Sequence, residues 1–213
     1  MTSIEYVILE VADPTTADRF YTQALGLGKQ VRTRASEAPT TGFRGYTLSL
    51  IVSQPANADA LIGAAVDAGA TVLKPAAKSL WGYGGVVQAP DGTLVTVASS
   101  SKKDTGPAVR QVDDLVLQLG STDVAASKRF YVERGLAVAK SFGSKYVEFD
   151  SGPIKLTLNK RRSLAKTAGV SEDGTGSHRI AFGSESGPFT DPDGFAWEHI
   201  TAAPGDAQPN PQI

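Results

Sequence analysis

The chain of 213 residues is long enough for one large domain or two of about 100 residues each. Its hydrophobic fraction of 41%, charged fraction of 20% and net charge of −1 are typical of a globular protein, and no basic run marks a nucleic-acid partner. The absence of cysteine excludes disulfides, thiolate nucleophiles and iron–sulfur clusters. No apolar run approaches the roughly 18 residues of a membrane span, and the first segment does not have the pattern of a signal peptide. We therefore expect a cytoplasmic protein without a membrane partner.

The first half of the chain predicts a strand, a helix and further strands. The alternating apolar segment EYVILEV at 5–11 predicts a strand. Residues 11–27 predict an amphipathic helix with Asp13 as its N-cap and Phe20 and Tyr21 on its inner face. A strand at 43–53, an alanine-rich helix at 57–70 and two more strands follow. Pro-Asp-Gly at 90–92 precedes the last strand, where glycine permits the positive φ of a tight turn.

The second half repeats this order. DDLVLQL at 113–119 predicts a strand, and 121–138 predicts a helix with Asp123 as its N-cap and Arg-Phe-Tyr at 129–131. Strands at 140–150 and 153–160, a helix at 162–169, a strand at 178–184 and a second Pro-Asp-Gly turn at 192–194 follow. The offset between Phe20 and Phe130 is 110 residues, whereas that between Gly92 and Gly194 is 102, so the second half is eight residues shorter. We infer that the eight residues are lost in the region of the second helix of that half.

The strand pattern, the Arg-Phe-Tyr helix, the Pro-Asp-Gly turn and their duplication resemble the vicinal-oxygen-chelate superfamily. This group contains glyoxalase I, extradiol dioxygenases, fosfomycin-resistance enzymes and bleomycin-binding proteins. The resemblance covers residues 1–202 and implies an α+β fold of two tandem βαβββ modules that form paired half-open barrel sheets. We predict a first module at 1–100, a linker at 101–109, a second, shortened module at 110–202 and a flexible tail at 203–213.

The resemblance also directs attention to metal ligands. In metal-dependent members each module gives a His or Gln from its first strand and a Glu from its last strand. The matching positions of the first module are Tyr6 and Thr96, which are poor ligands at neutral pH. In the second module Glu198 matches the glutamate, and either Asp114 or Val116 takes the first-strand position. We therefore favour no cofactor, with a weakly held divalent metal on Asp114 and Glu198 as the alternative.

Other candidate ligand contacts lie where the resemblance places a cleft between the modules. Trp81 and Tyr83 belong to a glycine-rich hairpin that would stack a planar ligand, although Trp81 could instead cap the core. Glu198 is a candidate base, with an Arg-paired or solvated carboxylate as the alternative. The remaining candidates, each with a purely structural alternative, are Tyr6, Tyr146, Glu148, Arg162, His178 and Trp197.

These observations predict a glyoxalase-like protein that binds a small molecule in the inter-module cleft without a metal. The ligand would be an aromatic or anionic metabolite or antibiotic, and the role resistance or sequestration. The alternative is an enzyme of the same superfamily, a lyase, isomerase or ring-modifying enzyme, with Glu198 as base or, together with Asp114, as metal ligand. A scaffold with a vestigial cleft is a third hypothesis. We expect a monomer or a weak homodimer.

Overall fold

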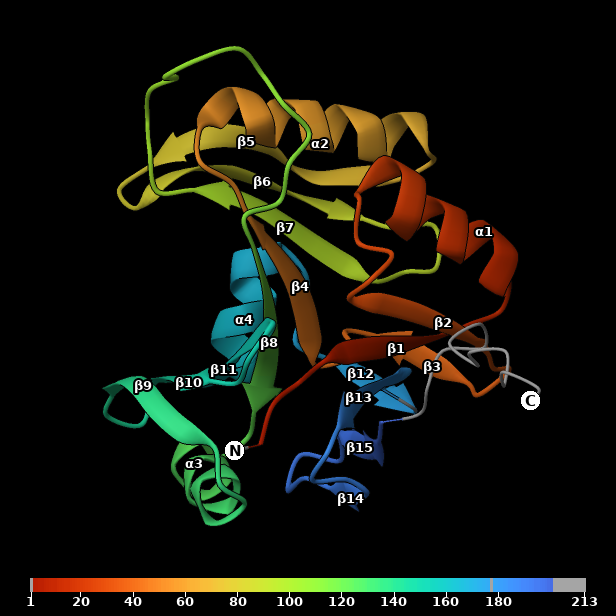
Figure 1. The fold of residues 1–213 in the computed structure, drawn as a ribbon, viewed down its shortest axis with the longest axis vertical. Coiled ribbons are helices and arrows are strands. Elements are labelled where there is room, and N and C mark those ends of the chain that lie inside the picture. The colour runs from red at the N-terminus through yellow and green to blue at the C-terminus, as the bar shows by residue number, and fades with distance from the viewer. Residues whose placement is uncertain (1, 177, 201–213) are drawn as a thin grey trace, which may run out of the picture.

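The structure, a computed structural model, describes residues 2–176 and 178–200, and the predicted tail at 203–213 lies outside these ranges. Within them the chain forms an eight-stranded and a five-stranded sheet and a small two-stranded one (Figure 1). One buried hydrophobic cluster contains residues of both large sheets, so the two sheets share a single main core.

The eight-stranded sheet is built from two βαβββ units. The first comprises β4 (Tyr46–Ile51), α2 (Pro55–Asp67), β5 (Thr71–Ser79), β6 (Gly82–Gln88) and β7 (Leu94–Ser99). The second comprises β8 (Asp114–Ser121), α3 (Val124–Glu133), β9 (Ala137–Phe142), β10 (Tyr146–Asp150) and β11 (Ile154–Lys160). In each unit the first strand is parallel to the last, and β4 pairs antiparallel with β8 at the centre of the sheet.

The five-stranded sheet is built from the two ends of the described chain. From the first half come β1 (Tyr6–Val11), α1 (Pro14–Arg19), a π-helical turn (Phe20–Ala24) and β2 (Val31–Ala35). From the second come β13 (Ile180–Ser184), β14 (Phe189–Thr190) and β15 (Ala196–His199). The order is β14-β15-β13-β1-β2, with β1 antiparallel to β13. The small sheet pairs β3 (Thr40–Gly42) with β12 (Gly174–Gly176).

Each half of the sequence therefore contributes strands to both large sheets. The predicted α+β class is confirmed. The βαβββ units occupy 46–99 and 114–160, which is a finer division than the modules predicted at 1–100 and 110–202. The predicted linker at 101–109 falls between β7 and β8, where the two units meet.

The duplicated sequence motifs form the local structures that they predict. Asp13 and Asp123 cap α1 and α3, because the Oδ1 atom of each accepts hydrogen bonds from the backbone amides two and three residues further on. Gly92 and Gly194 adopt φ values of 88° and 91° in the two Pro-Asp-Gly turns. The helix predicted at 162–169 is α4 (Arg161–Ala168), which has eight residues where α2 has 13.

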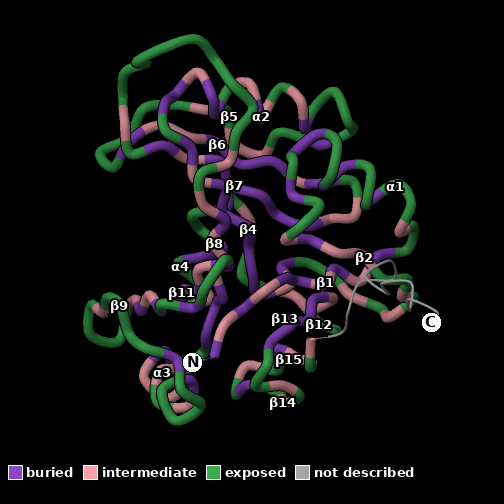
Figure 2. Tube along the Cα trace, in the orientation of Figure 1, coloured by how far each residue is buried: buried purple, intermediate pink, exposed green. Residues whose placement is uncertain are grey.

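The two faces of the eight-stranded sheet have different partners. Leu48, Leu50, Leu115 and Leu117 point into the main core with the other sheet, and the ribbon is buried along these central strands (Figure 2). The opposite face curves inward and is partly covered by α4 (Arg161–Ala168). A separate apolar cluster holds this helix, with Leu164, Ala165 and Ala168 against Phe43, Val86 and Leu94.

Two buried tyrosines connect the sheets through the duplicated motifs. Tyr21, which follows α1, donates to the Oδ1 atom of Asp91 in the β6–β7 turn at 3.0 Å. Tyr131 of α3 donates to the Oδ2 atom of Asp191, ahead of β15, at 2.6 Å. In both cases the tyrosine is associated with one sheet and the aspartate with the other. Asp91 belongs to the first Pro-Asp-Gly motif, whereas Asp191 immediately precedes the second.

The segment between β7 and β8 runs over the outside of α2 and is largely exposed (Figures 1 and 2). The Gln54 side chain makes several of the hydrogen bonds that hold it in place. Gln54, just before α2, accepts from the backbone amides of Thr105 and Gly106 and donates to the carbonyls of Gly106 and Pro107. These bonds join the linker to the first unit.

Candidate functional site

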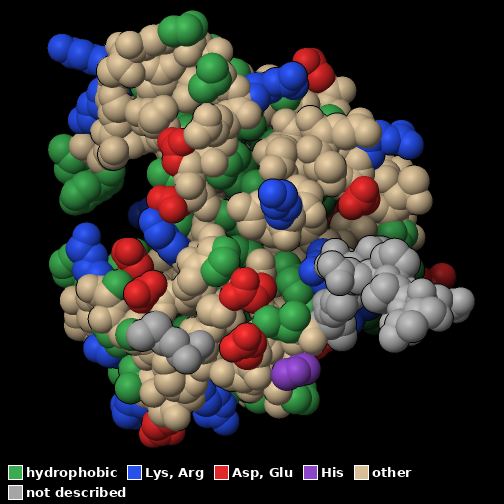
Figure 3. Space-filling model, viewed as in Figure 1, with side chains coloured by type: hydrophobic (Ala, Val, Ile, Leu, Met, Phe, Trp, Pro, Cys, Tyr) green, Lys and Arg blue, Asp and Glu red, His purple; other side chains and the backbone are tan. Residues whose placement is uncertain are grey.

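The inward-curving face of the eight-stranded sheet contains a cleft made of two adjoining cavities. The larger has a volume of about 450 Å³ and the smaller about 300 Å³, and Ser49 and Gln118 line both. Figure 3 shows this hollow between the upper and lower lobes, with hydrophobic side chains on its upper lip. We call it the concave-face cleft.

Strand alternation explains the floor of this cleft. Successive side chains of a strand point to opposite faces, so β4 and β8 send their leucines into the core and their intervening residues into the cleft. The intervening residues are Thr47, Ser49 and Ile51 on β4 and Asp114, Val116 and Gln118 on β8. Thr47 donates to the side-chain carbonyl of Gln118 at 2.9 Å, which joins the two units across their antiparallel pair. The floor is therefore largely polar, with Thr47 and Ser49 buried and the other four residues half-buried.

The wing formed by β5 and β6 gives the cleft a flat upper wall and an aromatic rim. Gly82, Gly84 and Gly85 line the larger cavity and leave the backbone without side chains there. A Cβ atom on Gly84 would lie 2.3 Å from the carbonyl oxygen of Val97, so this strand can pack against β7 only as glycine. Trp81 stands at the turn between the two strands with 85% of its surface exposed. Glycine backbone beside an exposed indole offers stacking surface to a planar ligand.

Tyr83, predicted to contact the ligand, makes its polar contact away from this cleft. Its hydroxyl donates to Asp59 of α2, which covers the outer face of the wing, at 2.8 Å. This hydrogen bond, with a smaller contribution from burial, raises the pKa of Tyr83. Tyr83 is nevertheless one of the residues that line the larger cavity.

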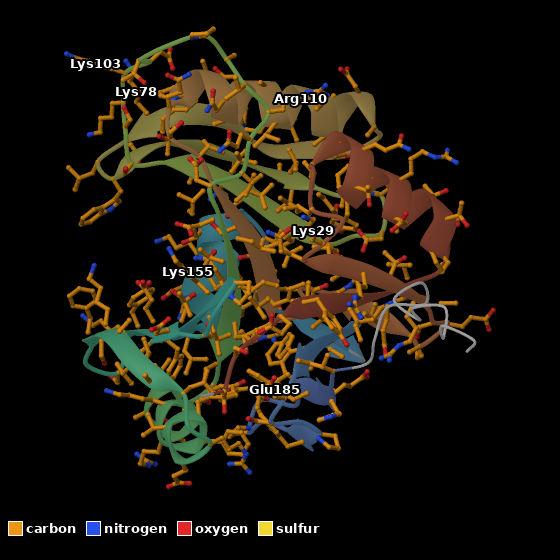
Figure 4. All side chains as sticks on the ribbon, viewed as in Figure 1. Lys29, Lys78, Lys103, Arg110, Lys155 and Glu185 are labelled. Atoms are coloured by element: carbon orange, nitrogen blue, oxygen red, sulfur yellow. The ribbon has the colours of Figure 1, made fainter. Side chains whose placement is uncertain are left out.

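The wing formed by β9, β10 and β11 gives the cleft its charged groups. Lys155 of β11 forms an ion pair with Asp114 of β8 at 2.7 Å, and it projects between the two wings (Figure 4). Tyr146 donates to Glu148, two residues further along β10, at 2.9 Å. As predicted, these two residues share a face while Val147 is buried on the other. Burial first and the Glu148 carboxylate second raise the pKa of Tyr146, so the phenol is neutral at physiological pH.

Glu198, the leading sequence candidate, lies in the other sheet and is paired with arginine. Arg34 of β2 donates to both of its carboxylate oxygens, at 2.9 and 3.0 Å, and also forms an ion pair with Glu10. The hydrogen bonds from Arg34 to Glu198 are the main cause of a raised pKa of the guanidinium. A carboxylate with both oxygens engaged by one guanidinium is poorly placed to accept a further proton. Of the two roles considered for Glu198, the structure shows the arginine-paired carboxylate.

The structure does not bring the predicted cleft residues together. Trp197 is only 1% exposed and stacks on Phe189 inside the core, so the prediction that it contacts a ligand is wrong. Tyr6 is buried in β1 of the five-stranded sheet beneath the Arg32 guanidinium. Trp81, Tyr146 and Glu148 belong to the eight-stranded sheet. A cleft that combines Trp81 with Tyr6, Trp197 and Glu198 is thus absent from the described residues.

His178 and Arg162 also lie outside the concave-face cleft. Both ring nitrogens of His178 face backbone carbonyls, those of Arg44 and Asp193, at 2.7 and 2.8 Å, and the ring stacks on Phe195. These contacts give the imidazole a structural role between two loops. Arg162 is exposed on the outer side of α4 and lines a shallow surface depression.

The donor set does not fit a metal centre of the kind that the sequence resemblance implies. Asp114 and Glu198 belong to different sheets and are each paired with a cation, Lys155 and Arg34 respectively. No group of three or more His, Asp or Glu side chains within 2–176 and 178–200 is arranged to hold an ion. Thr96, the other position examined for a ligand, contributes a hydroxyl to the larger cavity.

Several residues of the cleft were not among the sequence candidates. Among them are Ser49, Gln118, Lys155 and Thr157. A sequence signal for them exists in the polar residues that interrupt the apolar strands TLSL, LVLQL and IKLTL at every second position. Only the pairing of β4 with β8 and of β8 with β11 shows that these positions converge on one surface.

Comparison with solved structures gives the fold a name. Glyoxalase I from Zea mays is similar over 92% of this chain and 91% of its own, with a TM-score of 0.56 and 15% identity. A candidate dioxygenase from Bacillus subtilis is similar over 85% of this chain and 69% of its own, with a TM-score of 0.53 and 15% identity. The chain has the vicinal-oxygen-chelate fold. At these identities the likeness establishes the fold alone, because one fold hosts many chemistries.

Sequence comparisons add no closer relative to this fold assignment. No family model matches the chain, and no curated protein matches it. Among the described residues, no helix combines the length and apolar character required to cross a membrane. The vicinal-oxygen-chelate fold therefore rests on architecture and on the duplicated motifs.

Proposed function

We propose that this protein binds a small planar organic anion in the concave-face cleft and does so without a metal ion. The observation that carries the proposal is the cleft itself, which joins a bare glycine wall and an exposed indole to a polar floor. Cavities of 450 and 300 Å³ are of the size that proteins use for small ligands. The expected role is sequestration of an aromatic metabolite or antibiotic.

The charges of the cleft support an anionic ligand. Lys74 and Lys78 line the larger cavity and Lys155 the smaller. Lys74 donates to the carbonyls of Lys166 and Thr167 at the end of α4, and Lys155 is paired with Asp114. Lys78 is exposed on the wing, so it is the lysine best placed to meet a carboxylate at the rim. Ligand specificity would then come from stacking on Trp81 together with one charged contact.

Binding is tested by calorimetry with a panel of planar aromatic carboxylates, beginning with naphthalene-2-carboxylate. Trp81→Ala and Lys78→Gln change exposed side chains and leave the core untouched. We expect each to weaken binding about tenfold, the usual size of the loss of one stacking or charged contact. Glu198→Gln is the matched control and should bind like the wild type. Equal binding by all four proteins would place the ligand elsewhere, and weakened binding by Glu198→Gln alone would restore the five-stranded sheet as the site.

An acid–base enzyme is a second candidate function, favoured by Tyr146 and Glu148. The neutral phenol could donate a proton or hydrogen bond and the carboxylate could accept one, both from the wall of the smaller cavity. Incubation of the protein with a compound that it binds, followed by mass spectrometry, tests this. A product formed by the wild type and lost in Glu148→Gln would support the enzyme, and recovery of the unchanged compound would support the binder.

A further inference from the structure

A second, smaller pocket lies at the far end of the eight-stranded sheet. It has a volume of about 230 Å³ and is enclosed by the residues before β4, the β6–β7 turn and the loop after α4. Its walls include Phe43, Arg44, Leu94 and Val170. No residue of this pocket lines either cavity of the concave-face cleft, so the two sites are separate.

The guanidinium of Arg44 is the unusual group in this pocket. Its Nη2 atom donates to the backbone carbonyl of Asp91 at 2.5 Å. Its Nη1 atom is buried and has no hydrogen-bond partner among the described residues. None of the ion pairs of the described chain includes Arg44. A buried charged donor without an acceptor is costly, and an anion that accepts from it would relieve this cost.

The other polar groups of the wall already have partners. The Thr93 hydroxyl donates to the Asp91 carboxylate at 2.8 Å, and the Gln88 amide donates to the carbonyl of Gly92 at 3.3 Å. The hydroxyl of Tyr46 lies 3.3 Å from that of Thr93. Phe43 and Leu94 supply apolar surface from the cluster beneath α4. One free cationic donor beside apolar walls matches a ligand with a single anionic head and a short apolar body.

Asp173 limits the charge that the pocket would accept. Its carboxylate lies at the exposed rim, where Oδ2 accepts from the Ser171 hydroxyl at 2.7 Å. A second negative charge on the ligand would face this carboxylate, which disfavours dianions such as succinate or phosphate.

We propose that this pocket binds a small aliphatic monocarboxylate, with its carboxylate on the Nη1 atom of Arg44 and its alkyl part against Phe43 and Leu94. A guanidinium nitrogen suits a carboxylate oxygen because a hydrogen bond between two charged groups is stronger than one between neutral groups. The volume limits the ligand to a few heavy atoms. This site is independent of the proposed function and stands if the concave-face cleft proves empty.

The test uses the full chain and titrates butyrate against chloride at constant ionic strength. The readout is the amide NMR signals of Gly92 and Thr93, which lie in the pocket wall. We expect saturable shifts in the wild type, and an apparent Kd about tenfold higher in Arg44→Gln. Arg162→Gln, which removes the same charge from the exposed face of α4, should titrate like the wild type. Linear, unsaturated shifts in the wild type, or equal affinity in Arg44→Gln, would overturn the proposal.

Two further variants keep the test decisive if Arg44→Gln does not fold. Val170→Phe fills the pocket from its partly buried loop and leaves every bond of Arg44 in place, so it should abolish the saturable shifts. Asp173→Asn removes the rim charge and should let succinate bind about as well as butyrate. Unchanged butyrate binding by Val170→Phe, or continued exclusion of succinate by Asp173→Asn, would contradict the assigned geometry.

Discussion

The surroundings of single carboxylates determine their roles in this molecule. Glu198 is bound by both terminal nitrogens of Arg34, and Asp114 is neutralised by Lys155. Asp191 differs from both because it has no cationic partner among the described residues. It is buried and accepts from Tyr131 and from the backbone amides of Asp193 and Phe195. Its charge is therefore stabilised by hydrogen bonds alone.

Tyr131→Phe removes one of these hydrogen bonds. Because the Asp191 carboxylate is buried, we expect the free energy of unfolding to fall by about 2 kcal/mol, within the range for a bond to a charged group. Tyr21→Phe is the matched variant. It breaks the corresponding bond to Asp91, which is less buried, so the loss should be smaller. Urea denaturation measures both. Equal losses would show that burial of the carboxylate does not set the energy of this contact.

The pH dependence of stability should report on Asp191. Burial raises the pKa of this carboxyl above its ordinary value of 3.8, although the bond from Tyr131 opposes the shift. The folded protein therefore holds this proton more tightly than the unfolded chain does. The stabilising contribution of the group is complete below pH 3.8 and is lost as the pH rises through the folded pKa. We expect Asp191→Asn, relative to the wild type, to gain stability as the pH is raised across this window. A constant difference between the two proteins across the window would contradict the raised pKa.

At the scale of elements, α4 is the helix that covers part of the inward-curving face. The helix packs on the inward-curving face, and its C-terminal carbonyls accept from Lys74 of β5. Gly169 ends it with φ of 84°, where a Cβ atom would also lie 2.7 Å from the side chain of Lys74. The helix therefore connects the second unit to the wing of the first.

Leu164→Ala tests how firmly α4 is held. Leu164 is buried against Phe43, Val86 and Leu94, so its truncation should cost about 2–4 kcal/mol of unfolding free energy. Ser163→Ala, on the exposed side of the same helix, should change stability by less than about 0.5 kcal/mol. Thermal and urea unfolding measure the difference. A loss below 1 kcal/mol for Leu164→Ala would mean that the helix detaches readily from the sheet.

The helices, strands and turns could be predicted from the sequence, but only part of the candidate site could. The helix caps at Asp13 and Asp123 and the two glycine turns follow from local chemistry, and the structure has each of them. The placement of Trp197 and Glu198 could not be predicted in the same way. It depends on which strands pair. An alternating pattern predicts which side chains of a strand share a face, but it does not predict which strands lie beside it. Tyr21 was correctly expected on the inner face of its helix, yet the aspartate partners of Tyr21 and Tyr131 needed the structure.

At the scale of the whole molecule, three antiparallel strand pairs join the halves of the chain. Two belong to the large sheets, β4 with β8 and β1 with β13, and the third is β3 with β12. A single core cluster lies between the two large sheets. Neither half can therefore bury its apolar surface without the other, and we expect one cooperative unfolding transition.

Trp81→Phe provides the measurement of this cooperativity. It removes the exposed indole and leaves Trp197, buried between the sheets, as the remaining tryptophan. Fluorescence then reports the core while far-UV circular dichroism reports the strands and helices. The two urea transitions should coincide in midpoint. Separate midpoints would show that the five-stranded sheet melts by itself.

The exposed segment between β7 and β8, which Gln54 binds, is a place where a protease could cut the chain. A single nick near residues 108–112 would separate the sequence into two pieces while leaving every strand of both sheets in place. Because each piece contributes strands to both large sheets, the two fragments would remain associated without a covalent bond. The peptide link between the halves thus matters more while the chain folds than it does for holding the folded protein together.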